Sequence, residues 1–258
     1  MTQRVFTPLQ PRRAERRGGL EAFYTRSREA ASWLPADLDW NAVGDLGKTR
    51  TEVAWILASQ SIGTEQVGLL VAAKMLAEVD DYDARAILAL QVADEAKHSD
   101  LFERYVRAVG GEPAGFSESV EDLDISMSKL QEEDSVGLYF VHTFLECLAL
   151  DEFGYLQAAF PHDILGEIYR RVARDEARHV AFGLIFLRDW AGQSGAVDKA
   201  KIDLYLDLAK RIGGINEQTI SGLSSLSGAP ADSIREDLES KALARMRYLQ
   251  GTTTSPIG

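Results

Sequence analysis

The sequence predicts an all-α protein, a bundle of four long helices with additional helices at its N- and C-terminal ends. Apolar residues recur at helical spacing over long segments, and nearly all of the seven prolines lie outside those segments. Two similar motifs, Asp94–His98 (DEAKH) and Asp175–His179 (DEARH), each place a Glu and a His three residues apart on one helical face. A further Glu precedes each motif Glu by the same interval, which indicates an internal repeat of two helix pairs.

The first half of the chain should contain the first helix pair. Its expected elements are, in order, a basic mobile arm at 1–20, a short helix near 20–32, an irregular stretch with Pro35 and Gly44, and long helices at about 49–78 and 82–109. Gly110 and Gly111 end the second long helix, because glycine readily takes the backbone conformation that closes a helix. Residues 112–131 then form a long crossover, with or without a short helix.

The second half should contain the second pair and two further helices. Its expected elements are long helices at about 133–159 and 162–193, shorter helices at about 197–212 and 231–249, and a flexible tail at 251–258. Pro161 lies near the first turn of the fourth long helix, where proline is tolerated. Short turns within each pair and one long connection between the pairs predict a single helical domain over 21–250, with its metal-binding core at 49–193.

Six side chains form the candidate metal site. Glu65 and Glu146 each stand on an otherwise apolar helical face, and each precedes a motif Glu by 30 residues (95 − 65 and 176 − 146). About 13 residues to a helix end, a short turn and about 13 residues back return the chain to the same height. The expected ligands are Glu65, Glu95, His98, Glu146, Glu176 and His179. Glu152 is an alternative to Glu146, but it lacks the repeat spacing.

Four buried glutamates should either become neutral or pair with cations, because buried carboxylates without partners cost many kcal/mol. Two divalent ions would balance the four carboxylates, with both histidines as neutral ligands. A ligand set that is rich in oxygen, with one nitrogen for each metal, suits iron or manganese. The pattern therefore predicts a two-metal site inside a helical bundle.

The composition argues against several classes of partner. A net charge of −12 disfavours nucleic acid and anionic membranes. No apolar run is long enough to cross a bilayer, and the basic start is not followed by a signal-peptide core, so we expect a cytoplasmic protein. Cys147 is the only cysteine, so the chain has no cysteine pair for a built-in iron module. Electrons would therefore come from an external ferredoxin or reductase.

With these six residues, the segment 49–193 resembles the ferritin-like di-metal carboxylate superfamily, in particular its oxidase and oxygenase branch related to ribonucleotide reductase small subunits. The resemblance implies a ferritin-like bundle that binds two iron ions, or one manganese and one iron, and activates dioxygen. It also implies that Asp94 and Asp175, which precede the motif glutamates, hold the ligating histidines by their second ring nitrogens.

The chain departs from its relatives at three points. Phe102 stands where reductase subunits that store a tyrosyl radical have a tyrosine. Val141 and Gly68 stand where ligand-binding oxidases of the superfamily form a crosslink between Tyr and Val, so we do not expect that chemistry. The cysteine-rich iron module of rubrerythrins is also missing from the sequence.

Three further residues are candidates for a part in the chemistry. His142 lies four residues before Glu146 and shares its helical face. It is either a third histidine near the metals, as in the aryl-amine N-oxygenases, or a hydrogen-bonded histidine at the pocket edge. Tyr139 and Tyr105 each lie seven residues from a predicted ligand, and each is either a redox or hydrogen-bonding tyrosine or an ordinary core aromatic.

Together these features predict a homodimeric, non-haem di-iron oxygenase or oxidase. It would use O2 to act on a small organic substrate by hydroxylation, N-oxygenation, desaturation or oxidative cleavage. One alternative is a ferritin- or rubrerythrin-like protein that oxidises iron or removes peroxide. The other is an inert helical interaction protein that binds no metal.

Overall fold

The computed structural model describes residues 19–115, 118–194, 199–213 and 217–250. Within these residues the chain forms nine α-helices and no strand, which confirms the predicted all-α class. The predicted N-terminal arm, apart from its last two residues, and the predicted tail lie outside the described residues. No helix in the described part of the chain is both long and apolar enough to cross a membrane.

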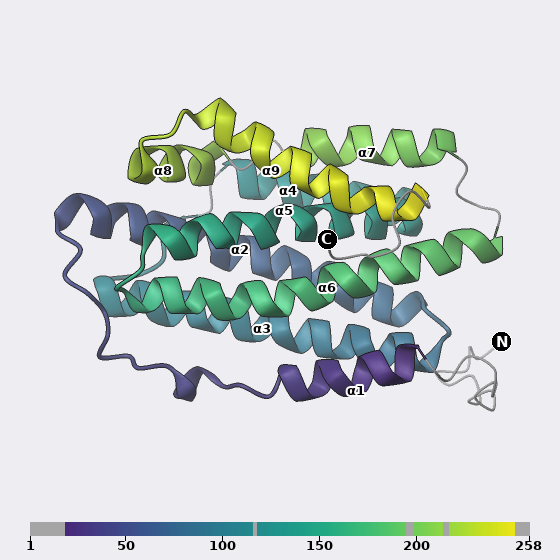
Figure 1. The fold of residues 1–258 in the computed structure, drawn as a ribbon, viewed down its shortest axis with the longest axis horizontal. Coiled ribbons are helices and arrows are strands. Elements are labelled where there is room, and N and C mark those ends of the chain that lie inside the picture. The colour runs from purple at the N-terminus through teal and green to yellow at the C-terminus, as the bar shows by residue number, and fades with distance from the viewer. Residues whose placement is uncertain (1–18, 116–117, 195–198, 214–216, 251–258) are drawn as a thin grey trace.

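Four long helices form the bundle at the centre of the molecule (Figure 1). They are α2 (Lys48–Glu78), α3 (Tyr82–Val109), α5 (Ser135–Ala159) and α6 (Ile164–Ser194). Helix α2 packs mainly against α3, and α5 packs mainly against α6, as the internal repeat predicts. Because each pair is joined by a short turn, its two helices run antiparallel.

The remaining helices cover the bundle on several sides (Figure 1). They are α1 (Leu20–Ala30), α4 (Glu118–Glu133), α7 (Lys199–Gly213), α8 (Glu217–Ser227) and α9 (Ala231–Met246). Helix α1 lies along α3, whereas α7, α8 and α9 all pack on α5. Helix α4 bridges α2 and α5 within the crossover. Short 3₁₀ turns at Pro35–Asp37 and Arg247–Gln250 complete the described chain.

Local chemistry sets the ends of the bundle helices. The Asp81 carboxylate accepts a hydrogen bond of 2.9 Å from the backbone N–H of Ala84 and so caps the start of α3. Gly110, with φ of 140°, ends that helix, in a backbone conformation that favours glycine. The Asp163 carboxylate accepts hydrogen bonds of 2.8 Å from the N–H groups of Leu165 and Gly44. It therefore starts α6 and anchors the irregular segment that follows α1.

Two predicted helix ends differ from the structure, and one helix was not predicted. The fourth long helix begins at Ile164 rather than 162, so Pro161 lies in the preceding turn and not in the first helical turn. The last helix ends at Met246 and continues as a 3₁₀ turn. Helix α8 was not predicted, because its sequence is rich in Ser, Thr and Gly, which disfavour helices. Burial of Thr219, Ile220 and Leu223 against the bundle stabilises it instead.

The buried apolar side chains form two clusters, one on each side of a polar layer. On α3, for example, Leu88 belongs to one cluster and Leu101 to the other. On α6, Val172 and Val180 are divided in the same way. On α2, α3 and α6 this order places the predicted ligands between the two clusters, whereas Glu146 on α5 lies within the end of the first cluster.

Candidate metal centre

The polar layer contains all six predicted ligands, and each is at most 7% exposed. Their potential ligand atoms form two groups, and within each group these atoms lie within 4.8 Å of one another. The first group is Glu65, Glu95, His98 and Glu176, and the second is Glu95, Glu146, Glu176 and His179. Glu95 and Glu176 belong to both groups. The layer can therefore hold two ions side by side, with these two carboxylates between them.

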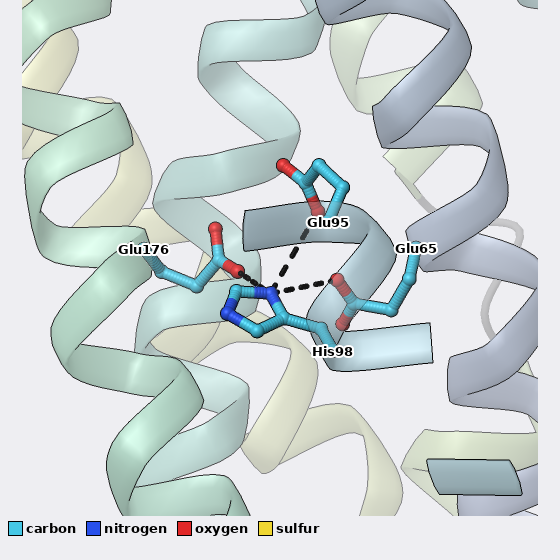
Figure 2. A group of neighbouring side chains, drawn as sticks. All are labelled: Glu65, Glu95, His98 and Glu176. Atoms are coloured by element: carbon cyan, nitrogen blue, oxygen red, sulfur yellow. Dashed lines mark hydrogen bonds and ion pairs between the residues drawn. The ribbon is translucent and has the colours of Figure 1, made fainter. Parts of the chain in front are cut away.

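In the first group, three carboxylates converge on one histidine nitrogen (Figure 2). His98 Nδ1 lies 3.1 Å from Glu65 Oε2, 3.3 Å from Glu176 Oε1 and 3.8 Å from Glu95 Oε2. Ligands at about 2.1 Å from an octahedral metal ion lie about 3 Å from their neighbours. The spacing of these donor atoms is close to that of one metal coordination shell.

The second group repeats this arrangement. His179 Nδ1 lies 3.0 Å from Glu176 Oε2, 3.3 Å from Glu95 Oε1 and 3.6 Å from Glu146 Oε2. Each histidine thus directs Nδ1 to one terminal glutamate and to the two shared glutamates. The two halves of the internal repeat supply equivalent groups to the two halves of the site.

The two aspartates contact the opposite ring nitrogens, and they do so across the bundle. Asp175 Oδ2 on α6 lies 3.1 Å from His98 Nε2 on α3, and Asp94 Oδ2 on α3 lies 3.4 Å from His179 Nε2 on α6. The helices are antiparallel, so the first position of one motif lies beside the last position of the other. Each aspartate therefore orients the histidine of the other motif.

Two cations in the motifs hold these aspartates in place. Lys97 Nζ lies 2.8 Å from both Asp94 Oδ1 and Asp175 Oδ2. Arg178 likewise contacts Asp94 at 2.8 Å and Asp175 at 2.5 Å. Sequence reasoning missed this role, although the fourth position of both motifs carries a cation.

The charged side chains of this cluster do not balance one another without metal ions. The positive charges of Lys97 and Arg178 balance the negative charges of Asp94 and Asp175. The four glutamates then leave four negative charges, which two divalent ions would neutralise. A second indication of a metal site comes from Glu95, whose Oε1 atom is buried and makes no well-formed hydrogen bond within the described structure, its neighbour His179 Nδ1 lying 3.3 Å away. Such a buried polar atom is costly unless a cation or donor meets it.

Burial and mutual proximity shift the pKa values of these groups. Burial, followed by the negative charge of Glu146, raises the pKa of Glu176 to about 8. Burial alone would lower the pKa of His98 and of His179, but the facing carboxylates of Glu65 and Glu176 raise both well above the ordinary value. When no metal is bound, protons on Glu176, His98 and His179 therefore supply positive charge that the metal ions would otherwise supply. Metal ions would have to displace them.

Trp33 closes the outer side of the aspartate layer. Its indole N–H donates to Asp175 Oδ2 at 3.1 Å, and Lys97 Nζ lies 4.1 Å from the centre of its ring. Arg171 lies over the same ring at 5.3 Å. Sequence reasoning missed Trp33, because it comes from the irregular segment after α1 and carries no helical pattern.

His142 lies beside a predicted ligand but outside both ligand groups. Its Nε2 atom is 3.0 Å from Glu146 Oε1, and the Gln91 side-chain amide donates to the same oxygen at 3.0 Å. Both side chains are buried. Both side chains therefore contact the Glu146 carboxylate and can hold it in position.

The other candidate residues also lie outside the ligand groups. Tyr139 packs edge-on against Phe186, and Tyr105 is fully buried in the second apolar cluster. Burial raises the pKa of both tyrosines. Glu152 lies in neither group and instead lines a cavity.

A cavity of about 130 Å³ adjoins the metal site. All four glutamates of the site line it, whereas His98 and His179 do not. The histidine side of the site is occupied by the aspartates and their cations. Access to the metal pair is therefore from the carboxylate side, where most of the remaining wall is apolar.

Comparison with known proteins supports the fold. No protein-family model matches the chain, and no curated protein matches it by sequence. Solved structures of the R2-like ligand-binding oxidase do match. One variant with an aerobically reconstituted Mn/Fe cofactor has a TM-score of 0.72 at 18% identity. Another, with an aerobically reconstituted Fe/Fe cofactor, has a TM-score of 0.71 at 16% identity.

Each of these matches covers 89% of this chain and 93% of the other. The chain has the fold of these oxidases. The likeness confirms the ferritin-like bundle with added helices, and it extends well beyond the segment 49–193 on which the sequence resemblance rested.

Proposed function

We propose that this chain is a di-metal oxidase that uses O2 to oxidise a small organic molecule. The observation that carries the proposal is the pair of ligand groups that share Glu95 and Glu176. The matched oxidases, which were reconstituted with Mn/Fe or Fe/Fe, support two iron ions or one manganese and one iron as the occupants. A redox-active metal pair would supply the electrons and the Lewis acidity for O2 activation.

The chain itself supplies positioning and exclusion of water. Glu65 and Glu146 would each hold one ion, the shared glutamates would hold both, and the crossed aspartates fix the two imidazoles. The apolar clusters on both sides of the layer keep bulk water away. Because the six predicted ligands already face one another, we expect metal binding to require little reorganisation.

The cavity favours an organic substrate over iron storage. Its wall combines the four glutamates with side chains such as Val67, Leu123 and Phe153. An apolar wall of this kind suits a carbon skeleton, whereas a path for hydrated iron would be lined by polar groups. Hydroxylation, N-oxygenation, desaturation and oxidative cleavage all fit such a pocket. Electrons would come from an external ferredoxin or reductase, and we propose a cytoplasmic homodimer.

The proposal is tested by loading the protein with Fe(II), alone or with Mn(II), and following O2 consumption and product mass with a panel of amines and fatty acids. We expect stoichiometric O2 consumption and an oxygenated, desaturated or cleaved product. Glu65→Gln should abolish both signals. Glu103→Gln makes the same chemical change on the exposed face of α3 and should leave both intact. Storage of many irons per chain without substrate oxidation would favour the iron-handling alternative.

A further inference from the structure

The cavity beside the metal site is lined on one side by α5. Its lining on that helix extends from His142 to Phe153, which corresponds to about 16 Å along the axis. Helices α2, α4 and α7 supply the opposite walls. The apolar lining includes Val67, Val120, Leu123, Met127, Leu148 and Ile212. A ligand in this cavity would therefore be mostly hydrocarbon.

Glu152 adds a carboxyl group to this wall at a distance from the metal pair. It lies six residues after Glu146, about 9 Å further along the axis of α5. It belongs to neither ligand group. The other ionisable side chain in the wall that is not a predicted ligand, His142, lies against Glu146.

The carboxyl group of Glu152 is held by α8. The hydroxyl group of Thr219, a buried residue of that helix, hydrogen-bonds to it. Burial raises the pKa of Glu152 to about 7, and the hydrogen bond from Thr219 opposes this rise. A cation that entered the pocket would stabilise the ionised form further.

An acid at this place selects among possible ligands. A fatty acid or another anion would be repelled by the Glu152 carboxylate. A neutral hydrocarbon would gain nothing from it. A protonated amine would form a charge-assisted hydrogen bond with it, and the partial burial of Glu152 in a mostly apolar wall would strengthen that pair.

We propose that Glu152 binds the protonated amino group of the substrate, which is an alkyl amine whose apolar body extends along α5 toward the metal pair. This inference rests on the proposed function, because it places the amine in the cavity of that same site. Glu152 sets specificity and orientation, and it does not contact the metal ions.

The test measures binding under anaerobic conditions by calorimetry, on protein loaded with Mn(II). The probes are hexylamine, 1-hexanol and hexanoate, which share a chain length and differ in charge. We expect the wild type to bind hexylamine most tightly. Glu152→Gln keeps the size and the contact with Thr219 but removes the charge, so it should weaken hexylamine binding about tenfold or more. It should leave 1-hexanol binding unchanged.

Two further variants complete the design. Glu121→Gln makes the same change at an exposed position of α4, next to the pocket residue Val120, and should alter nothing. Glu152→Asp keeps the charge and should retain the preference for the amine. Circular dichroism verifies the fold of each variant.

The outcomes separate the two proposals. If the wild type holds two metals and consumes O2 but shows no preference for the amine, the inference about Glu152 is wrong and the proposed function stands. The same conclusion follows if Glu152→Gln leaves the preference unchanged. If the wild type binds no metal, both proposals are wrong.

Discussion

Asp175 Oδ2 lies 3.1 Å from His98 Nε2, although the two residues belong to different halves of the internal repeat. The equivalent contact between Asp94 and His179 measures 3.4 Å. Each half of the site thus depends on an aspartate from the other half. This exchange links α3 to α6 and predicts how loss of one aspartate should affect the metals.

We expect Asp175→Asn to weaken the metal position at His98, and Asp94→Asn to weaken the one at His179. Changes to groups that orient metal ligands typically cost about 10- to 100-fold in affinity. Anomalous diffraction from crystals equilibrated with limiting Mn(II) measures the occupancy of each position separately. Loss of metal at the histidine of the same motif would show that the crossed contacts do not govern affinity.

Lys97 should contribute to stability through the same layer. It contacts both aspartates with a side chain that is only 12% exposed, so Lys97→Met removes one of the two side chains, Lys97 and Arg178, whose permanent charges balance these buried carboxylates. We expect the free energy of unfolding to fall by about 3 kcal/mol. Denaturant unfolding measures this change. Lys74→Met, which breaks a surface pair with Glu78, should cost about 1 kcal/mol or less. Equal effects of the two variants would contradict the proposed role of Lys97.

Metal affinity should rise with pH. The pKa of Glu176 is raised to about 8 and that of both histidines lies well above 6.5, so these groups carry protons at neutral pH unless metal displaces them. We expect Mn(II) binding to release protons at pH 7 and to weaken as the pH falls from 8 to 6. Calorimetry in buffers of different ionisation enthalpy measures the proton release. Affinity that is independent of pH would contradict these shifts.

The raised pKa values of Glu176 and the two histidines also predict how the stability of chelator-treated, metal-free protein changes with pH. A group whose pKa is raised on folding contributes stability that is lost as the pH rises toward the folded value. For Glu176 the loss extends from the ordinary value of 4.5 to about 8, and for the histidines it begins at 6.5. Unfolding free energies measured between pH 5 and pH 8 should therefore decrease with pH unless metal is added.

Gly183 should be required for the close approach of α5 and α6. A Cβ atom there would lie 2.6 Å from Thr143 Oγ1 and 2.7 Å from its Cγ2 atom, and Thr143 is buried. We expect Gly183→Ala to destabilise the fold by about 1 to 3 kcal/mol. Gly154 on α5 has no neighbour within 4 Å of its Cβ position, so Gly154→Ala should instead stabilise the helix by about 0.5 to 1 kcal/mol. Thermal unfolding of both variants compares the two effects.

The sequence allowed the six predicted ligands to be located because helical phase and the equal spacing of Glu65 and Glu146 from the motifs are local properties. The partners of the aspartates could not be predicted in this way. They depend on the antiparallel register between α3 and α6, which side-chain packing sets. Trp33 reaches Asp175 from 142 residues away in the chain. Helix α8 depends on tertiary burial that its own composition does not indicate.

We propose that two metal ions share Glu95 and Glu176, and metal analysis after anaerobic Fe(II) loading and desalting measures how many ions each chain holds. We predict close to two metals per wild-type chain. Glu65→Ala should remove one of them, whereas Glu95→Ala should weaken both, because its carboxylate belongs to both ligand groups. A wild-type chain that holds fewer than two metals, or a Glu95→Ala variant that retains both at full affinity, would contradict the claim.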